Sequence, residues 1–161
     1  MQELLSADDF PRIVNEYSDT IYRIAINQTH NPQDSFDICQ EVFVKLVENR
    51  HKIKDETHLK AWLIRVAVNT SKSWLRHADN RLTVGLYEAA EVACSPPLYD
   101  NSVSEAIRQL PEKSAIVIHL FYYEEMKISD ISKTLGITQS AVKLRLKRGR
   151  EKLKNILEKE D

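Results

Sequence analysis

The stretch that decides the fold is MKISDISKTLGITQSAVKLRLKRGREKLKNIL, residues 126–157. Ile128, Ile131 and Leu135 recur at spacings of three and four, which predicts a short amphipathic helix. Gly136 follows, and glycine ends a helix at low cost because it adopts the left-handed conformation. A second amphipathic helix then begins, and its apolar residues share one face: Val142, Leu146 and Leu153.

Two hydroxyl residues are placed to cap these helices. We expect Ser129 to cap the first and Thr138 the second, because a side-chain oxygen there accepts from a free backbone N–H. The opposite face of the second helix is basic and carries Lys143, Lys147, Arg148 and Arg150, with Arg145 at its edge. A short helix, a glycine turn and a longer basic helix are typical of a helix-turn-helix that inserts its second helix into the DNA major groove.

The charge of this stretch departs from that of the chain. Between Thr138 and Lys154, seven lysines or arginines accompany one glutamate, a local charge of +6, whereas the whole chain carries −1. A charged face alone is typical of any solvated helix. The two helices joined at a glycine favour a basic surface that binds nucleic acid over an ordinary solvated face.

Charge alternates along the whole chain in four blocks. Residues 1–56 carry −5, residues 57–83 carry +4, residues 84–125 carry −5 and residues 126–161 carry +5. Two basic blocks indicate two separate nucleic-acid contacts, with acidic surfaces facing other partners.

Composition places the protein among all-α soluble proteins. It has only three glycines in 161 residues, and no apolar run reaches the length of a membrane span. The first residues, MQELLSADDF, do not resemble a signal peptide, so we expect a cytoplasmic protein without membrane insertion. Cys39 and Cys94 are far apart, match no metal spacing and are expected to be reduced thiols. We expect no cofactor and no metal.

Helical periodicity predicts three helices in the first half of the chain, Asp8–Gln28, Gln33–Asn49 and Leu59–His77. Asp8 or Asp9 is expected to cap the first. The core face of the second helix is apolar: Phe36, Val42, Phe43, Leu46 and Val47.

The third helix combines an aromatic residue with polar and basic ones. Trp62 is interpreted as a core anchor, with the alternative that it stacks on an unpaired base. The exposed side of this helix is polar and carries Arg65, Asn69, Lys72, Ser73 and Arg76.

Two small helical domains joined by a flexible linker are therefore expected. The stretch Asp79–Asn101 is acidic, has little periodicity and contains Ser95-Pro96-Pro97, which forbids a continuous helix. We assign residues 1–79 to the first domain, 80–102 to the linker and 103–161 to the second domain. In the second domain, Ser104–Gln109 predicts a short helix, and an apolar helix after Pro111 forms the core.

With these residues placed, the chain resembles a bacterial sigma factor of the extracytoplasmic-function group, within the sigma-70 family. Three stretches carry the resemblance in the family's order. DSFDICQEVFVKLVEN (34–49) and LKAWLIRVAVNTSKSWLRH (59–77) resemble the family's second region, and ISDISKTLGITQSAVKLRLKRGREKLK (128–154) resembles its fourth region.

The resemblance implies partners for each part of the chain. It implies core RNA polymerase, whose β′ clamp coiled coil would meet Asp37, Gln40 and Glu41 and whose β flap would meet the second domain. It implies promoter DNA, with the −10 strand on Trp62, Arg65, Asn69, Lys72, Ser73 and Arg76. It also implies an anti-sigma factor, whose identity the residues do not give, and a role in the stress response.

At the −35 element, the resemblance implies a set of contacts on the last helix. The expected base readers are Gln139, Ser140, Lys143, Leu144, Lys147 and Arg148. Arg145 and Arg150 are expected to hold phosphates or an acid such as Glu151.

The sequence departs from the family's usual pattern on this helix. A frequent Ser is Leu144 here, and a frequent Ala is Gly149. We expect both to mark where promoter choice differs from that of relatives.

A stand-alone helix-turn-helix regulator remains the alternative, although it would leave the basic third helix unexplained. An enzyme is not indicated, because the five histidines form no HExxH pattern and no glycine-rich phosphate loop occurs.

Overall fold

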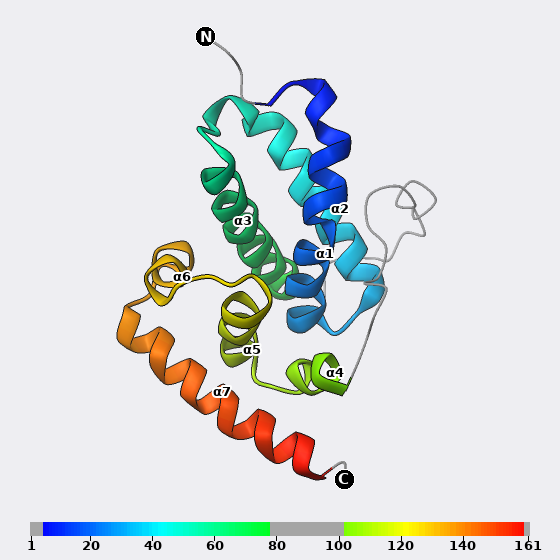
Figure 1. Cartoon of the computed structure of the whole chain (residues 1–161). Coiled ribbons are helices and arrows are strands. Elements are labelled where there is room, and N and C mark those ends of the chain that lie inside the picture. The colour runs from blue at the N-terminus through cyan, green and yellow to red at the C-terminus, as the bar shows by residue number, and fades with distance from the viewer. Residues whose placement is uncertain (1–4, 78–101, 160–161) are drawn as a thin grey trace. The chain divides into compact units, whose positions relative to one another are not determined.

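The computed structural model describes residues 5–77 and 102–159. The chain divides into two compact units, Met1–Pro97 (unit 1) and Leu98–Asp161 (unit 2). The described residues contain seven α-helices and no strand (Figure 1), as the all-α prediction requires. The predicted linker, Asp79–Asn101, and Cys94 lie outside the described residues.

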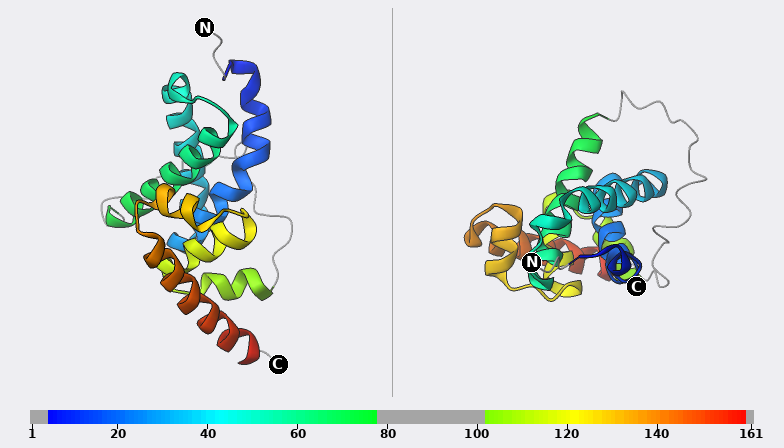
Figure 2. Two further views of the ribbon diagram at one scale, coloured as in Figure 1. Left: turned by 60° about the vertical axis from the view of Figure 1, so that its left-hand side comes forward. Right: turned by 90° about the horizontal axis from the view of Figure 1, so that it is seen from above.

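Unit 1 is a three-helix arrangement of α1 (Phe10–Thr29), α2 (Pro32–Asn49) and α3 (Glu56–Arg76). Each of these helices packs on the other two, and Figure 2 shows α1, α2 and α3 side by side from two further directions. Their shared core is aliphatic and fully buried, and includes Ile13, Ile21, Ile38, Leu46, Leu59 and Leu63.

The breaks between these helices have local causes. His30 ends α1 in the left-handed conformation (φ 53°), and Asn31 caps α2 by accepting from the Asp34 backbone N–H at 3.0 Å. A 3-10 turn, η2 (Arg50–Lys52), then leads to Asp55, which caps α3 by accepting from the His58 N–H at 2.7 Å. The third helix therefore begins three residues before the predicted Leu59.

The predicted cap of the first helix is wrong. A 3-10 turn, η1 (Ala7–Asp9), precedes α1, and the Asp9 carboxylate accepts from the Ser6 backbone N–H at 2.8 Å instead of capping α1. This hydrogen bond lowers the pKa of Asp9. Further along α1, burial raises the pKa of Tyr17 to about 12, with Glu16 and Glu56 adding to the shift.

Unit 2 contains α4 (Ser102–Arg108), α5 (Glu112–Ile118), α6 (Ile128–Leu135) and α7 (Gln139–Lys159). A single π-helical turn, η5 (His119–Tyr123), extends α5. As predicted from its apolar sequence, α5 forms the core, since every residue from Ser114 to Leu120 is buried. The longest helix of unit 2, α7, packs on α4, α5 and α6 and so presents its remaining face to solvent (Figure 1).

Candidate nucleic-acid interfaces

Hydrogen bonds between the end of α6 and the residues that follow it fix the turn of the helix-turn-helix in unit 2. Gly136 has φ 68°, as predicted, and its N–H donates to the Ser132 carbonyl. The Ile137 N–H donates to the same carbonyl at 3.1 Å, and the Ser132 hydroxyl donates back to the Ile137 carbonyl. The Ile137 bond is the 6→1 bond of a Schellman motif, and the Gly136 bond is the 5→1 bond of an αL cap. Together they fix where the chain leaves α6 and enters α7.

One of the two predicted caps is confirmed. The Thr138 hydroxyl accepts from the Ala141 backbone N–H at 3.0 Å and so caps α7. Ser129 does not cap α6, because that helix begins at Ile128 and its N-cap is Lys127, which makes no side-chain cap. Ser129 is therefore the second residue inside the helix.

The inner face of α7 is set by three buried residues, Val142, Leu146 and Gly149. Gly149 lies against α5 so closely that a Cβ placed there would be 2.8 Å from Ile118 Cγ1. A real Cβ never approaches a carbon that closely without displacement, so glycine allows the two helices to pack. The expectation that Gly149 marks promoter choice is wrong, because this residue faces the core.

The outer face of α7 carries the predicted readers. Six of them are exposed: Gln139, Ser140, Lys143, Leu144, Lys147 and Arg148. Arg145 is half-buried at the edge of this face. Within the described part of the chain, no carboxylate forms an ion pair with Lys143, Lys147 or Arg148. We call these six exposed residues the α7 ridge.

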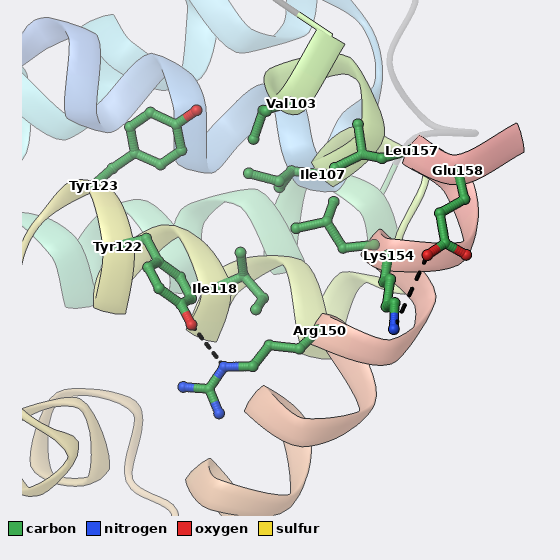
Figure 3. A pocket seen from close by; sticks show the side chains of 10 residues that line it. Val103, Ile107, Ile118, Tyr122, Tyr123, Arg150, Lys154, Leu157 and Glu158 are labelled. Atoms are coloured by element: carbon green, nitrogen blue, oxygen red, sulfur yellow. Dashed lines mark hydrogen bonds and ion pairs between the residues drawn. The ribbon is translucent and has the colours of Figure 1, made fainter. Parts of the chain in front are cut away.

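Arg150 is not part of the α7 ridge, because its side chain binds two aromatic residues of η5. Its Nε donates to the Tyr122 hydroxyl at 2.6 Å, and its guanidinium lies 5.6 Å from the ring centroids of both Phe121 and Tyr122. Figure 3 shows this hydrogen bond at the border of a pocket. The structure therefore gives Arg150 an aromatic partner on η5, where the sequence suggested a phosphate or Glu151.

That pocket is an apolar groove of about 560 Å³ between α4, η5 and α7. Its walls are mainly Val103, Ile107, Ile118, Leu153 and Leu157, and charged residues stand at its border (Figure 3). We call it the unit 2 groove. An apolar groove of this form fits the apolar face of a partner helix.

In unit 1, a second groove of about 470 Å³ lies where α2, η2 and α3 meet. Four of the six predicted −10 residues line it: Trp62, Asn69, Ser73 and Arg76. Trp62 is half-buried, so it borders a polar space and is not enclosed in the core. Arg65 and Lys72 are exposed on α3 but do not line this groove, which we call the unit 1 groove.

The structure adds residues that the sequence reasoning missed. Lys45, Asn49 and Lys52 line the unit 1 groove from the end of α2 and from η2. Lys45 Nζ donates to the Thr70 hydroxyl at 3.0 Å, and the Asn49 amide donates to the Lys45 carbonyl at 2.8 Å. Lys45 and Asn49 are four residues apart on one helical face, a spacing that could have indicated a shared surface.

A third surface lies along α2. Glu41 is exposed, and Asp37 and Gln40 are half-buried. Two valines on this side are also exposed, Val44 by 54% and Val47 by 47%. The expectation that Val47 belongs to the core is therefore wrong.

Among the residues that the structure describes, no group of three or more His, Cys, Asp or Glu side chains is arranged to hold a metal ion. No helix within residues 5–77 and 102–159 is long and apolar enough to cross a membrane.

Comparison with known proteins assigns each unit to a family. The chain matches the family model "Sigma-70 region 2" over residues 13–81 and the family model "Sigma-70, region 4" over residues 100–153. The first match contains most of α1 and all of α2 and α3, and the second contains α4, α5, α6 and most of α7.

Whole-chain relatives agree with this assignment. The chain is 29% identical to the ECF RNA polymerase sigma factor SigW of Bacillus subtilis, over 93% of this chain and 89% of that protein. It is 26% identical to the RNA polymerase sigma factor SigV of the same organism, over 92% and 90%.

A solved structure shares the fold. The sigma factor RpoE of Bartonella quintana, described in complex with the anti-sigma factor NepR, superposes with a TM-score of 0.73 at 19% identity, over 94% of this chain and 98% of that one. Two family models in the expected order, relatives over nearly the whole length and the shared fold agree. The chain belongs to the extracytoplasmic-function group of the sigma-70 family.

Proposed function

We propose that this protein binds core RNA polymerase, directs it to specific promoters and promotes opening of the −10 strands, without catalysis of its own. One observation carries the proposal: a single chain holds two candidate nucleic-acid surfaces of different form, the α7 ridge and the unit 1 groove. We assign residues 1–79 to core polymerase and −10 binding, 80–102 to the linker and 103–161 to −35 binding. Acting on the chromosome, it would work in the cytoplasm.

The α7 ridge supports binding to intact duplex. A helix fits the major groove of B-DNA, and lysine or arginine reads guanine O6 and N7 there. Lys143, Lys147 and Arg148 have no ion-pair partner among the described residues, so no internal pair must be broken when they meet DNA. Most of these contacts go to phosphates, with sequence read by fewer side chains.

The unit 1 groove supports binding to a single strand. An aromatic ring beside amide and hydroxyl groups can stack on an unpaired base and hydrogen-bond its edge. Trp62 supplies the ring, and Asn49, Asn69 and Ser73 supply the polar groups. Lys45, Lys52 and Arg76 add positive charge for the backbone of that strand.

Two further surfaces support contact with core polymerase. The α2 side with Asp37, Gln40, Glu41, Val44 and Val47 combines acids with exposed apolar side chains, as protein interfaces do. We assign it to the β′ clamp coiled coil. We assign the unit 2 groove to a helix of the β flap.

An anti-sigma factor is proposed as the regulator. The structural neighbour from Bartonella quintana is described in complex with one. Stress signalling through such a partner would follow from the same family membership.

Run-off transcription with purified core polymerase tests the proposal. The protein should co-elute with core polymerase and give a promoter-specific transcript that requires both the −35 and −10 elements. Glu41→Lys, on the α2 side, should reduce co-elution while leaving the fold intact by circular dichroism. Sequence-specific DNA binding without polymerase, and no transcript from any candidate promoter, would instead support a stand-alone regulator.

A further inference from the structure

Leu144 is a large apolar side chain on the outer face of α7 that takes no part in the core of unit 2. Its side chain is 46% exposed, whereas Val142 and Leu146 on the same helix are buried. At about 100° per residue, Leu144 stands roughly 200° around the helix from Val142. Packing within the protein therefore does not account for a leucine at this position.

The residues around Leu144 define what it faces. Ser140 lies one turn before it, Lys147 and Arg148 lie one turn after it, and Lys143 lies beside it, and all four are exposed. A partner that binds this surface must place an apolar group against Leu144 and negative charges against the basic residues around it. In the major groove, phosphates surround the base edges, and the only apolar group on those edges is the C5 methyl of thymine.

We propose that Leu144 is a specificity residue that reads the methyl group of one thymine in the −35 element. The proposal rests on the proposed function and names one feature of its DNA target. One helical turn, about 5.4 Å, separates Leu144 from Lys147 and Arg148, against a base-pair rise of about 3.4 Å. The thymine should therefore lie within about two base pairs of a guanine read by Lys147 or Arg148.

The test removes the methyl group without changing base pairing. Holoenzyme made from the full chain and core polymerase is first used to select a promoter from a randomised −35 library. Each thymine of the selected −35 duplex is then replaced singly by deoxyuridine, and binding is measured by competition for wild type, Leu144→Ala and Lys143→Ala.

Wild type should show one deoxyuridine position that weakens binding about fourfold, the effect of one buried methyl group. Leu144→Ala should bind the thymine and deoxyuridine duplexes equally. Lys143→Ala should bind every duplex more weakly yet keep the fourfold ratio, which separates loss of charge from loss of methyl reading. Circular dichroism of Leu144→Ala should match wild type, because the side chain is exposed.

Three results would overturn the proposal. Selected promoters without a thymine near the guanine would do so, as would a wild-type holoenzyme insensitive to every deoxyuridine. A deoxyuridine effect that persists in Leu144→Ala would assign the methyl contact to another residue. All three leave the proposed function intact, whereas failure of holoenzyme to select any promoter would overturn both.

Discussion

In unit 2 the candidate DNA surface is the outer face of one helix, and in unit 1 it is a concave groove between two helices and a 3-10 turn. The α7 ridge projects long side chains that have no internal ion pairs among the described residues. The unit 1 groove instead holds one of its two lysines by a hydrogen bond, from Lys45 Nζ to the Thr70 hydroxyl at 3.0 Å. Projecting cations suit an intact duplex, whereas a preformed polar recess suits a base that has left the stack.

Under the proposed function, the two DNA steps belong to different units. Duplex recognition would depend on charge and therefore on salt. Capture of an unpaired base would depend on stacking and on fixed hydrogen-bonding groups. Variants of each unit should therefore separate anchoring from strand opening.

The largest expected effect comes from the aromatic wall of the unit 1 groove. Trp62→Ala should weaken holoenzyme binding to a single-stranded −10 oligonucleotide by about 1–3 kcal/mol, because one base loses its stacking partner. Trp62→Phe should retain most of the affinity. Fluorescence anisotropy measures both, and thermal unfolding checks that Trp62→Ala still folds. An equal loss on a −35 duplex would contradict the assignment of Trp62 to the −10 strand.

On the α7 ridge we expect a comparable loss of binding affinity, limited to some −35 sequences. Arg148→Ala should weaken binding to the preferred −35 duplex by about 1–3 kcal/mol if its guanidinium is bidentate to a guanine. Competition binding against a panel of −35 variants provides the measurement. Equal loss on every sequence would assign Arg148 to phosphate.

A smaller effect separates the packing face of α7 from its DNA face. Gly149→Ala adds a methyl group against Ile118. Such overpacking lowers the free energy of unfolding by about 1–3 kcal/mol. About 1 kcal/mol of helix propensity opposes that cost, so urea unfolding should show a net loss of about 1 kcal/mol.

Ile118→Ala provides the second side of a double-mutant cycle. Gly149→Ala should cost less in the Ile118→Ala background, because the opposing Cγ1 is gone. Unchanged −35 preference is expected in all folded variants. A changed preference in Gly149→Ala alone would return this residue to the DNA face.

The sequence predicted those features that neighbouring residues determine, and it missed those that depend on packing between distant residues. Gly136 and Thr138 mark helix ends by their own chemistry, and the helix-turn-helix followed from them. Ser129 failed as a cap because α6 begins at Ile128, two residues earlier than a Ser129 cap requires. Gly149 could not be interpreted without its neighbour, since Ile118 is 31 residues away in sequence.

The unit 1 groove was predicted in part for the same reason. Trp62, Asn69, Ser73 and Arg76 share a single helix, so periodicity grouped them. Lys45, Asn49 and Lys52 come from another part of the chain, and only packing of α2 on α3 brings them to the same groove.

The smallest expected effect lies in the turn that precedes the helix-turn-helix. Glu125 has φ 54°, a left-handed conformation that costs a side-chain-bearing residue about 1–2 kcal/mol. Glu125→Gly should raise the free energy of unfolding by up to about 1 kcal/mol, because the extra chain entropy of unfolded glycine offsets part of the gain. Glu125→Ala, which keeps a Cβ, should give no such gain in urea unfolding.

The most direct test of the division between the two units is permanganate footprinting of unpaired thymines in the −10 element. With wild-type holoenzyme, these thymines should become reactive. With Lys147→Ala, fewer complexes should form, but those isolated should react like wild type. With Trp62→Ala, the −35 duplex should be occupied while the −10 thymines stay unreactive. Normal reactivity of the −10 thymines with Trp62→Ala, together with unreactive thymines in the isolated Lys147→Ala complexes, would contradict the account.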